Sequence, residues 1–200
     1  MTYIFAVLVL FQFASVQFVL ASYENASSAA DESPEILPQL VPTAVSEPTV
    51  GLPVRLKIPK IKVNAPIDYV GVLADGSMGI PALPQHTAWY QPGPRPGEIG
   101  SAVIDGHLNW WYGSAGVFGH LKSLKKGDIV SIQSDRGETI SFRVRATKLF
   151  REKDDATSIF TSTDGKAHLN LVTCDGVWVH ATKAYSQRLV VFTDKIENTK

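Results

Sequence analysis

Short runs of alternating apolar and polar residues dominate the chain from Arg55 onward. They are rich in β-branched and aromatic residues and are separated by turn sequences such as ADGS, KKGD and DRGE. This pattern is typical of strands, whereas helical patterning is confined to VFGHLKSL and DATSIF. The predicted strands are VRLKIPKIKV, APIDYVGVL, SAVIDGH, DIVSIQS, ETISFRVRATKLF, HLNLVTC and QRLVVFTDKI. We therefore expect a mainly β fold, with about seven or eight strands closed into one antiparallel or mixed barrel.

The first 22 residues follow a different pattern. They carry no charge, and residues 2–21 are long enough to cross a bilayer as a helix. The sequence VLA at residues 19–21 would suit a signal peptidase, and no Lys or Arg precedes the apolar run to fix its orientation. A transmembrane anchor, a cleaved signal segment and a buried core helix all remain open. Either membrane interpretation places the rest of the chain outside the cytoplasm.

Residues 23–53 are rich in Pro, Ser, Ala and Glu and show neither helical nor alternating periodicity. Such composition predicts a disordered, extended linker. The sequence thus divides into an anchor or signal segment at 1–22, a linker at 23–53 and a folded domain at 54–200. Every Lys and Arg lies at or after Arg55, so this last part carries 19 basic residues against 14 acidic ones. Since no basic run interrupts it, nucleic acid is not an expected partner.

Cys174 is the single cysteine of the chain, so it cannot form an internal disulfide. In HLNLVTC, Leu169 and Leu171 fall on one strand face and are expected to enter the core, while Cys174 falls on the other face. We expect it at the end of that strand, before a DG turn. A buried thiol acting as a small hydrophobe is the ordinary interpretation, and a nucleophile is the alternative.

A nucleophilic cysteine requires a proton partner, for which the sequence offers five histidines. His107 follows a strand and a glycine, so it occupies the same kind of position as Cys174. His168 lies six residues before Cys174, roughly 20 Å away on a continuous strand, and cannot reach the sulfur. The remaining three, expected to be ordinary hydrogen-bonded side chains, are His86, His120 and His180. With one Cys and no paired His at ligand spacing, neither a zinc site nor any other metal or cofactor is expected.

Arg188 is a candidate for the third group that acyl transfer requires, a donor for the developing oxyanion. It lies at the start of the predicted strand after the DG turn. A guanidinium only donates hydrogen bonds, so it would polarise a substrate carbonyl rather than orient a histidine. A strand-end arginine on the surface is the alternative interpretation.

Together these residues resemble the sortase family, membrane-anchored cysteine transpeptidases built on an eight-stranded barrel. The matching motifs are LVTC at 171–174, DGH at 105–107 and QR at 187–188, supported by LKIPKIKVNAPI and GVFGHLKSLKKGDIV. The resemblance covers roughly residues 55–196. The sequence is most similar to compact actinobacterial-type or unclassified members of the family. One departure is Asn170, where the family often has Thr. Another is the missing positive charge before the apolar segment.

The resemblance implies that Cys174 is the nucleophile, His107 the general acid and base, and Arg188 the stabiliser of the oxyanion. It implies cleavage of an LPXTG-like sorting motif between Thr and Gly, through a thioacyl intermediate, and transfer to an amine of the cell wall or of a pilin-type protein. It also implies an extracytoplasmic domain held at the cell membrane.

Other functions remain to be weighed against this one. A hydrolytic cysteine endopeptidase of the same fold would have the same sequence features. A tethered β-barrel binding module with an inert thiol is a further alternative. L,D-transpeptidases are also Cys/His enzymes, but their Ser-His-Gly-Cys arrangement is missing from LVTCDG.

Overall fold

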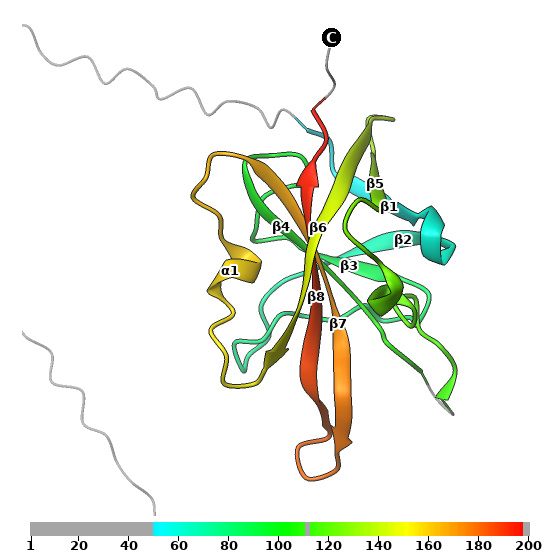
Figure 1. Cartoon of the computed structure of the whole chain (residues 1–200), viewed down its shortest axis with the longest axis vertical. Helices are drawn as coiled ribbons and strands as arrows, with labels where there is room; N and C mark the ends of the chain where they lie inside the picture. The colour runs from blue at the N-terminus through cyan, green and yellow to red at the C-terminus, as the bar shows by residue number, and fades with distance from the viewer. Residues whose placement is uncertain (1–49, 111–112, 198–200) are drawn as a thin grey trace, which may run out of the picture. The chain divides into compact units, whose positions relative to one another are not determined.

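Eight strands close into a barrel in the computed structural model, which describes residues 50–110 and 113–197 (Figure 1). The order around the barrel is β1-β2-β3-β4-β7-β8-β6-β5, and β2–β3 and β4–β7 are parallel pairs. This confirms the predicted mainly β, mixed barrel. The strands are β1 (Pro53–Ile58), β2 (Val63–Val70), β3 (Thr87–Tyr90), β4 (Gly100–Gly106), β5 (Ile129–Ser134), β6 (Thr139–Arg151), β7 (Ala167–Val179) and β8 (Ala184–Lys195).

Helical structure in the described residues is limited to short segments. Among them are η1 (Pro59–Ile61), η3 (Leu121–Ser123) and α1 (Thr157–Phe160), in agreement with the weak helical patterning of the sequence. Within residues 50–110 and 113–197 there is no helix that is long and apolar enough to span a bilayer. The predicted anchor or signal segment at 1–22 lies outside the described residues, as does the linker up to residue 49.

One predicted strand was wrong, and one strand was missed. The run VRLKIPKIKV is not one strand, because η1 begins at Pro59 and the chain reverses into β2, which pairs antiparallel with β1. Lys62 adopts a positive φ of 57° at this reversal. The sequence HTAWY was not predicted as a strand, but four of its residues form β3 between β2 and β4.

The barrel interior is filled by one face of each strand. Leu169 and Leu171 of β7 are fully buried there, as the alternation predicted, together with Ile104 of β4 and Leu189 and Val191 of β8. Because adjacent residues of a strand point to opposite sides, the neighbours of these residues face outward. The outer face of β4, β7 and β8 is therefore the face on which Cys174 lies.

Part of this outer face is also buried. Ile159 of α1 packs on Val103 of β4, Phe150 of β6 and Val190 of β8 in a second apolar cluster. Asn170 of β7 is fully buried beneath this segment and donates its side-chain amide to the carbonyl of Ile159 at 2.7 Å. The connection between β6 and β7 thus covers the middle of the face.

The packed domain begins slightly before the predicted boundary at residue 54. The N–H groups of Gly51 and Leu52 donate to the carboxylates of Glu138 and Asp135, and Arg95 donates to the carbonyl of Val50 at 2.8 Å. Residues 50–53, predicted as the end of the linker, therefore belong to the barrel.

Candidate active site

Cys174 lies within β7 rather than at its end. The strand continues to Val179 and pairs with β8 in a hairpin that projects beyond the barrel (Figure 1). The predicted DG turn is instead an irregularity in the register between Asp175 and Trp178, where Gly176 has a φ of 84°. This positive φ favours glycine at position 176, because a residue with a side chain would be strained there. The bulge lies directly after Cys174, and bulges commonly re-aim neighbouring side chains.

Arg188 lies directly opposite Cys174 on the neighbouring strand β8. Directly opposed residues of an antiparallel pair share a sheet face and have closely spaced Cβ atoms, so the structure brings these two candidates together. Arg188 is the fifth residue of β8 rather than its first, as the sequence had suggested. Its side chain is exposed and donates to the carbonyls of Tyr185 and Gln187, at 3.1 Å each.

His107 follows the last residue of β4 and lies beside the same part of β7. The parallel register places Asp105 opposite Val172, and two residues further along each strand are His107 and Cys174. The strands stay together at this point because the buried hydroxyl of Thr173 donates to the carbonyl of Gly106 at 2.7 Å. The structure therefore gathers all three predicted residues on the outer face of β4, β7 and β8.

The ring and the backbone of His107 are both held in place. Nε2 lies 2.8 Å from the carbonyl oxygen of Pro81, and the ring packs edge-on against Trp110 with centroids 4.9 Å apart. The carbonyl of His107 accepts the N–H of Phe118 at 2.9 Å. Glycine is needed at position 106, because a Cβ there would lie 2.6 Å from the ring of Phe118. The DGH motif thus turns the chain tightly out of the barrel at the histidine.

The thiol of Cys174 is half-buried, and its charge state depends on two neighbours. Burial raises the pKa of Cys174, the positive charge of Arg188 lowers it, and the negative charge of Asp105 raises it further. Burial is the largest of these effects, so the resting sulfur is a thiol rather than a thiolate at neutral pH. A base is therefore needed to form the nucleophile.

Sequence reasoning missed Asp105, Thr173 and the carbonyl of Pro81. Asp105 was detectable in principle, because it lies two residues before His107 and strand alternation puts it on the same face. Thr173 belongs to the LVTC motif, but strand alternation places it on the inward face with Leu171, so the sequence did not indicate a role near the site. The Pro81 contact joins positions 26 residues apart through an irregular loop, for which the sequence offers no periodic signal.

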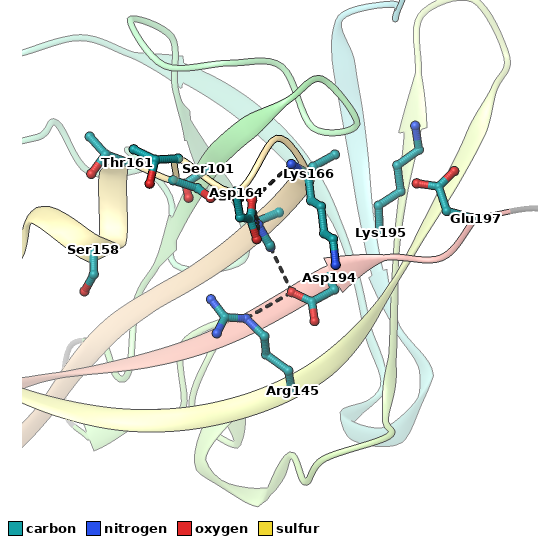
Figure 2. Close-up of a pocket in the computed structure, with 13 residues that line it drawn as sticks. Ser101, Arg145, Ser158, Thr161, Asp164, Lys166, Asp194, Lys195 and Glu197 are labelled. Carbon is teal, nitrogen blue, oxygen red and sulfur yellow. Dashed lines mark hydrogen bonds and ion pairs between the residues drawn. The ribbon is translucent and has the colours of Figure 1, made fainter.

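The other histidines do not join this group. Nδ1 of His86 is 2.9 Å from a carboxylate oxygen of Asp68, while His120 and His180 are exposed. His168 is buried at the far end of β7, between Asp164 and Asp194. His168 and these two carboxylates line a pocket of about 550 Å³ (Figure 2). None of Cys174, His107 and Arg188 lines this pocket.

Comparison with known proteins agrees with this geometry. The Sortase domain family model matches residues 56–196. A lid mutant of sortase A from Corynebacterium diphtheriae aligns with a TM-score of 0.57 and 23% identity, covering 74% of this chain and 72% of that chain. Sortase C-1 from Actinomyces oris aligns with a TM-score of 0.57 and 24% identity, covering 73% of this chain and 76% of that chain. Sortase C1 from Streptococcus agalactiae aligns with a TM-score of 0.56 and 21% identity, covering 73% of this chain and 68% of that chain.

At these identities the solved structures establish a shared fold. No curated protein sequence matches the chain significantly. The family model, however, spans nearly the whole barrel, from β1 to the residue after β8. The chain therefore belongs to the sortase family of cysteine transpeptidases.

Proposed function

We propose that this protein is an extracytoplasmic sortase that cleaves an LPXTG-like sorting motif between Thr and Gly and transfers the acyl group to an amine. The observation that carries the proposal is the direct opposition of Cys174 and Arg188 on β7 and β8, with His107 at the adjoining end of β4. This arrangement supplies a nucleophile, an anion-stabilising donor and a proton carrier on one accessible sheet face.

The first step is attack of the Cys174 sulfur on the Thr carbonyl carbon of the motif. The thiol must lose its proton, and His107 is the base that the arrangement offers. A carbonyl oxygen only accepts hydrogen bonds, so the contact with Pro81 assigns the hydrogen to Nε2 of His107. Nδ1 is then the nitrogen left to take the thiol proton.

Arg188 is proposed to stabilise the oxyanion that this attack produces. Its guanidinium stays charged at any working pH and presents several donors in one plane. One of its terminal nitrogens, Nη1, donates to two main-chain carbonyls of β8 rather than to a carboxylate. A substrate carbonyl would therefore compete for this donor with two neutral main-chain carbonyls and not with a carboxylate.

Collapse of the intermediate breaks the Thr–Gly bond, as protonated His107 gives its proton to the leaving amine. The Thr carbonyl is then a thioester of Cys174. In the second half of the reaction an amine attacks the thioester and restores the thiol, whereas water would release a free acid. Hydrolysis by the same residues is thus the alternative activity.

The proposed partners and location follow from the same reaction. The acyl donor is a protein bearing the sorting motif, and the acceptor is an amine of the cell wall or of a pilin-type protein. The apolar segment at 1–22 would hold the enzyme at the membrane, and the linker would give the barrel reach toward both substrates. We propose an extracytoplasmic barrel on this basis.

The test is incubation of the purified protein with peptides varied around LPXTG, with and without glycine-type or lysine-type amines, followed by mass spectrometry. We expect a thioacyl adduct on Cys174, cleavage after Thr, and an amide product when a suitable amine is present. Free acid as the sole product with every amine would favour the endopeptidase. Complete lack of adduct, with a thiol that still reacts with alkylating reagents, would reject the substrate assignment.

A further inference from the structure

Asp105 occupies the same surface as the three proposed catalytic residues, and the inference drawn from it rests on the proposed function. Alternation along β4 puts Asp105 and His107 on one face. Asp105 lies opposite Val172 of β7, and Cys174 follows Val172 on that face by two residues. Arg188 in turn lies opposite Cys174 on β8. The carboxyl group therefore belongs to the patch that holds the proposed nucleophile and its cation.

The immediate neighbours of Asp105 on the sheet are apolar. Ala88 of β3 lies opposite on one side and is fully buried, and Val172 lies opposite on the other. Asp105 itself is half-buried. Burial raises the pKa of Asp105 to about 7, while the positive charge of Arg188 and the N–H of Gly106 act in the opposite direction. Its proton is therefore exchanged in the neutral range.

Charged and titratable groups reach this face from each neighbouring element. Two of them interact with Asp105 in opposite senses: Arg188 favours the carboxylate, and a thiolate at Cys174 disfavours it. The others lie further along the strands. They are His107 after β4, the pair of Asp68 in β2 with His86 just before β3, and Lys148 of β6, whose ammonium group lies over the ring of Phe150.

We propose that Asp105 is a positioning residue that competes with the Cys174 sulfur for the positive charge of Arg188. When Asp105 is ionised, the guanidinium of Arg188 balances its negative charge, and that negative charge disfavours a thiolate at Cys174. When Asp105 is protonated, the guanidinium serves the sulfur and the substrate carbonyl alone. The carboxyl group of Asp105 and the thiol of Cys174 share one cation, Arg188, on a partly buried surface, so their titrations are coupled. A proton gained or lost by Asp105 therefore changes the ionisation of Cys174.

The test compares the full chain with its Asp105→Asn variant, using alkylation of Cys174 by iodoacetamide as a function of pH. This reagent is neutral and reads the thiolate without any sorting peptide. We expect alkylation near pH 7.5 to be roughly threefold faster or more in the variant, because a nearby like charge has been removed. The ionisation near pH 7 should also disappear from the pH profile of kcat/KM for peptide cleavage.

Asp128→Asn is the matched control, because it removes one carboxylate at the start of β5 and keeps an acceptor for the N–H of Lys125. Its alkylation profile should match that of the unaltered protein. Asp105→Ser serves as a second neutral variant if the asparagine variant fails to fold. Repeating Asp105→Asn in an Arg188→Gln background tests the competition, because the effect should shrink when the shared cation is gone.

An alkylation profile that is unchanged by both Asp105 variants would overturn this inference, whether or not peptides are cleaved. An effect of the same size in the Arg188→Gln background would overturn the competition for Arg188. Faster alkylation in the variants combined with no cleavage of any sorting peptide by the unaltered protein would instead reject the proposed function. The two failures are thus distinguishable.

Discussion

The two ends of the face formed by β4, β7 and β8 carry the same kinds of side chain in different arrangements. At one end, both ring nitrogens of buried His168 lie within 3.0 Å of carboxylate oxygens of Asp164 and Asp194, and Arg145 lies 3.0 Å from Asp194. Figure 2 shows Arg145 and Asp194 facing each other at this pocket. At the other end, Arg188 donates to main-chain carbonyls and His107 to the carbonyl of Pro81.

The difference separates a structural cluster from a chemically available one. The side chains around His168 satisfy one another's hydrogen bonds, which favours a fixed local structure and leaves little reactivity. Around Cys174, Arg188 and His107 donate to main-chain carbonyls, so neither is tied to a carboxylate by a hydrogen bond that a substrate would have to break. A buried histidine between carboxylates is thus the weaker functional candidate here, although it lines a pocket of about 550 Å³.

The largest expected contrast comes from removing the nucleophile. Cys174→Ala should abolish acyl transfer, by at least about 10³-fold, because no other group can form the thioester. The free energy of unfolding should change little, since one half-buried sulfur is lost. Peptide cleavage and chemical denaturation measure the two quantities. Substantial transfer in the variant would place the chemistry elsewhere.

Replacing the cation tests whether charge alone is sufficient at this end. Arg188→Lys keeps the charge and loses the planar set of donors, so we expect roughly a 10²-fold lower kcat/KM. Arg145→Lys at the other end is the matched control and should leave cleavage within about twofold, because Arg145 pairs with Asp194 in a half-exposed ion pair. A near-normal rate for Arg188→Lys would make Arg188 a surface residue.

The contrast between the two ends also shows how far sequence reasoning reached. Alternation in HLNLVTC correctly buried Leu169 and Leu171 and put Cys174 on the outer face, because a strand has a fixed period of two. The predicted end of this strand at Cys174 was wrong, since a DG pair inside a long hairpin forms a bulge as readily as a turn. The short strand β3 was missed because four residues carry too little periodicity.

The catalytic roles of Cys174, His107 and Arg188 stay a proposal, and the electrostatics of the face on which they lie could not be predicted from the sequence. The three candidates were found from their motifs, and the register now shows why they meet. The raised pKa of Asp105 depends on apolar neighbours contributed by β3 and β7, which are 17 residues before it and 67 after it in the chain. Such a combination cannot be recognised until the strand order is known.

The proton on Asp105 should make stability depend on pH. The folded protein holds this proton up to about pH 7, whereas the unfolded chain releases it near pH 4. Since the folded state binds more protons in this window, the free energy of unfolding should fall by about 4 kcal/mol between about pH 4 and pH 7 on this account, or about 1.4 kcal/mol for each pH unit. Denaturant titrations of the unaltered protein and Asp105→Asn measure the difference, and parallel pH curves would contradict it.

Removing the histidine at the other end should affect stability and not chemistry. His168→Gln leaves at least one of the two carboxylates without its ring-nitrogen partner, and the lost buried polar contacts are worth about 1–2 kcal/mol of unfolding free energy. Alkylation of Cys174 by iodoacetamide should be unchanged in the folded variant. Slower alkylation together with unaltered stability would show that the two ends are coupled.

The smallest expected effect gives the sharpest comparison, because the two ends contain equivalent threonines. Thr173 and Thr193 are both fully buried, and each donates a 2.7 Å hydrogen bond to a carbonyl, of Gly106 and Leu169 respectively. Valine preserves the shape and the strand preference but leaves the carbonyl without this donor. Each substitution should therefore lower the free energy of unfolding by about 1 kcal/mol in denaturant titrations.

Activity should separate the two variants. The Thr173 hydroxyl holds the end of β4 from which His107 projects, so Thr173→Val should reduce kcat for peptide cleavage about tenfold, because small displacements of a proton carrier are costly. Thr193→Val should leave kcat within about twofold, because its bond lies at the His168 end. Equal losses of activity in both variants would mean that strand pairing in general limits the reaction, and that Thr173 has no particular part in placing His107.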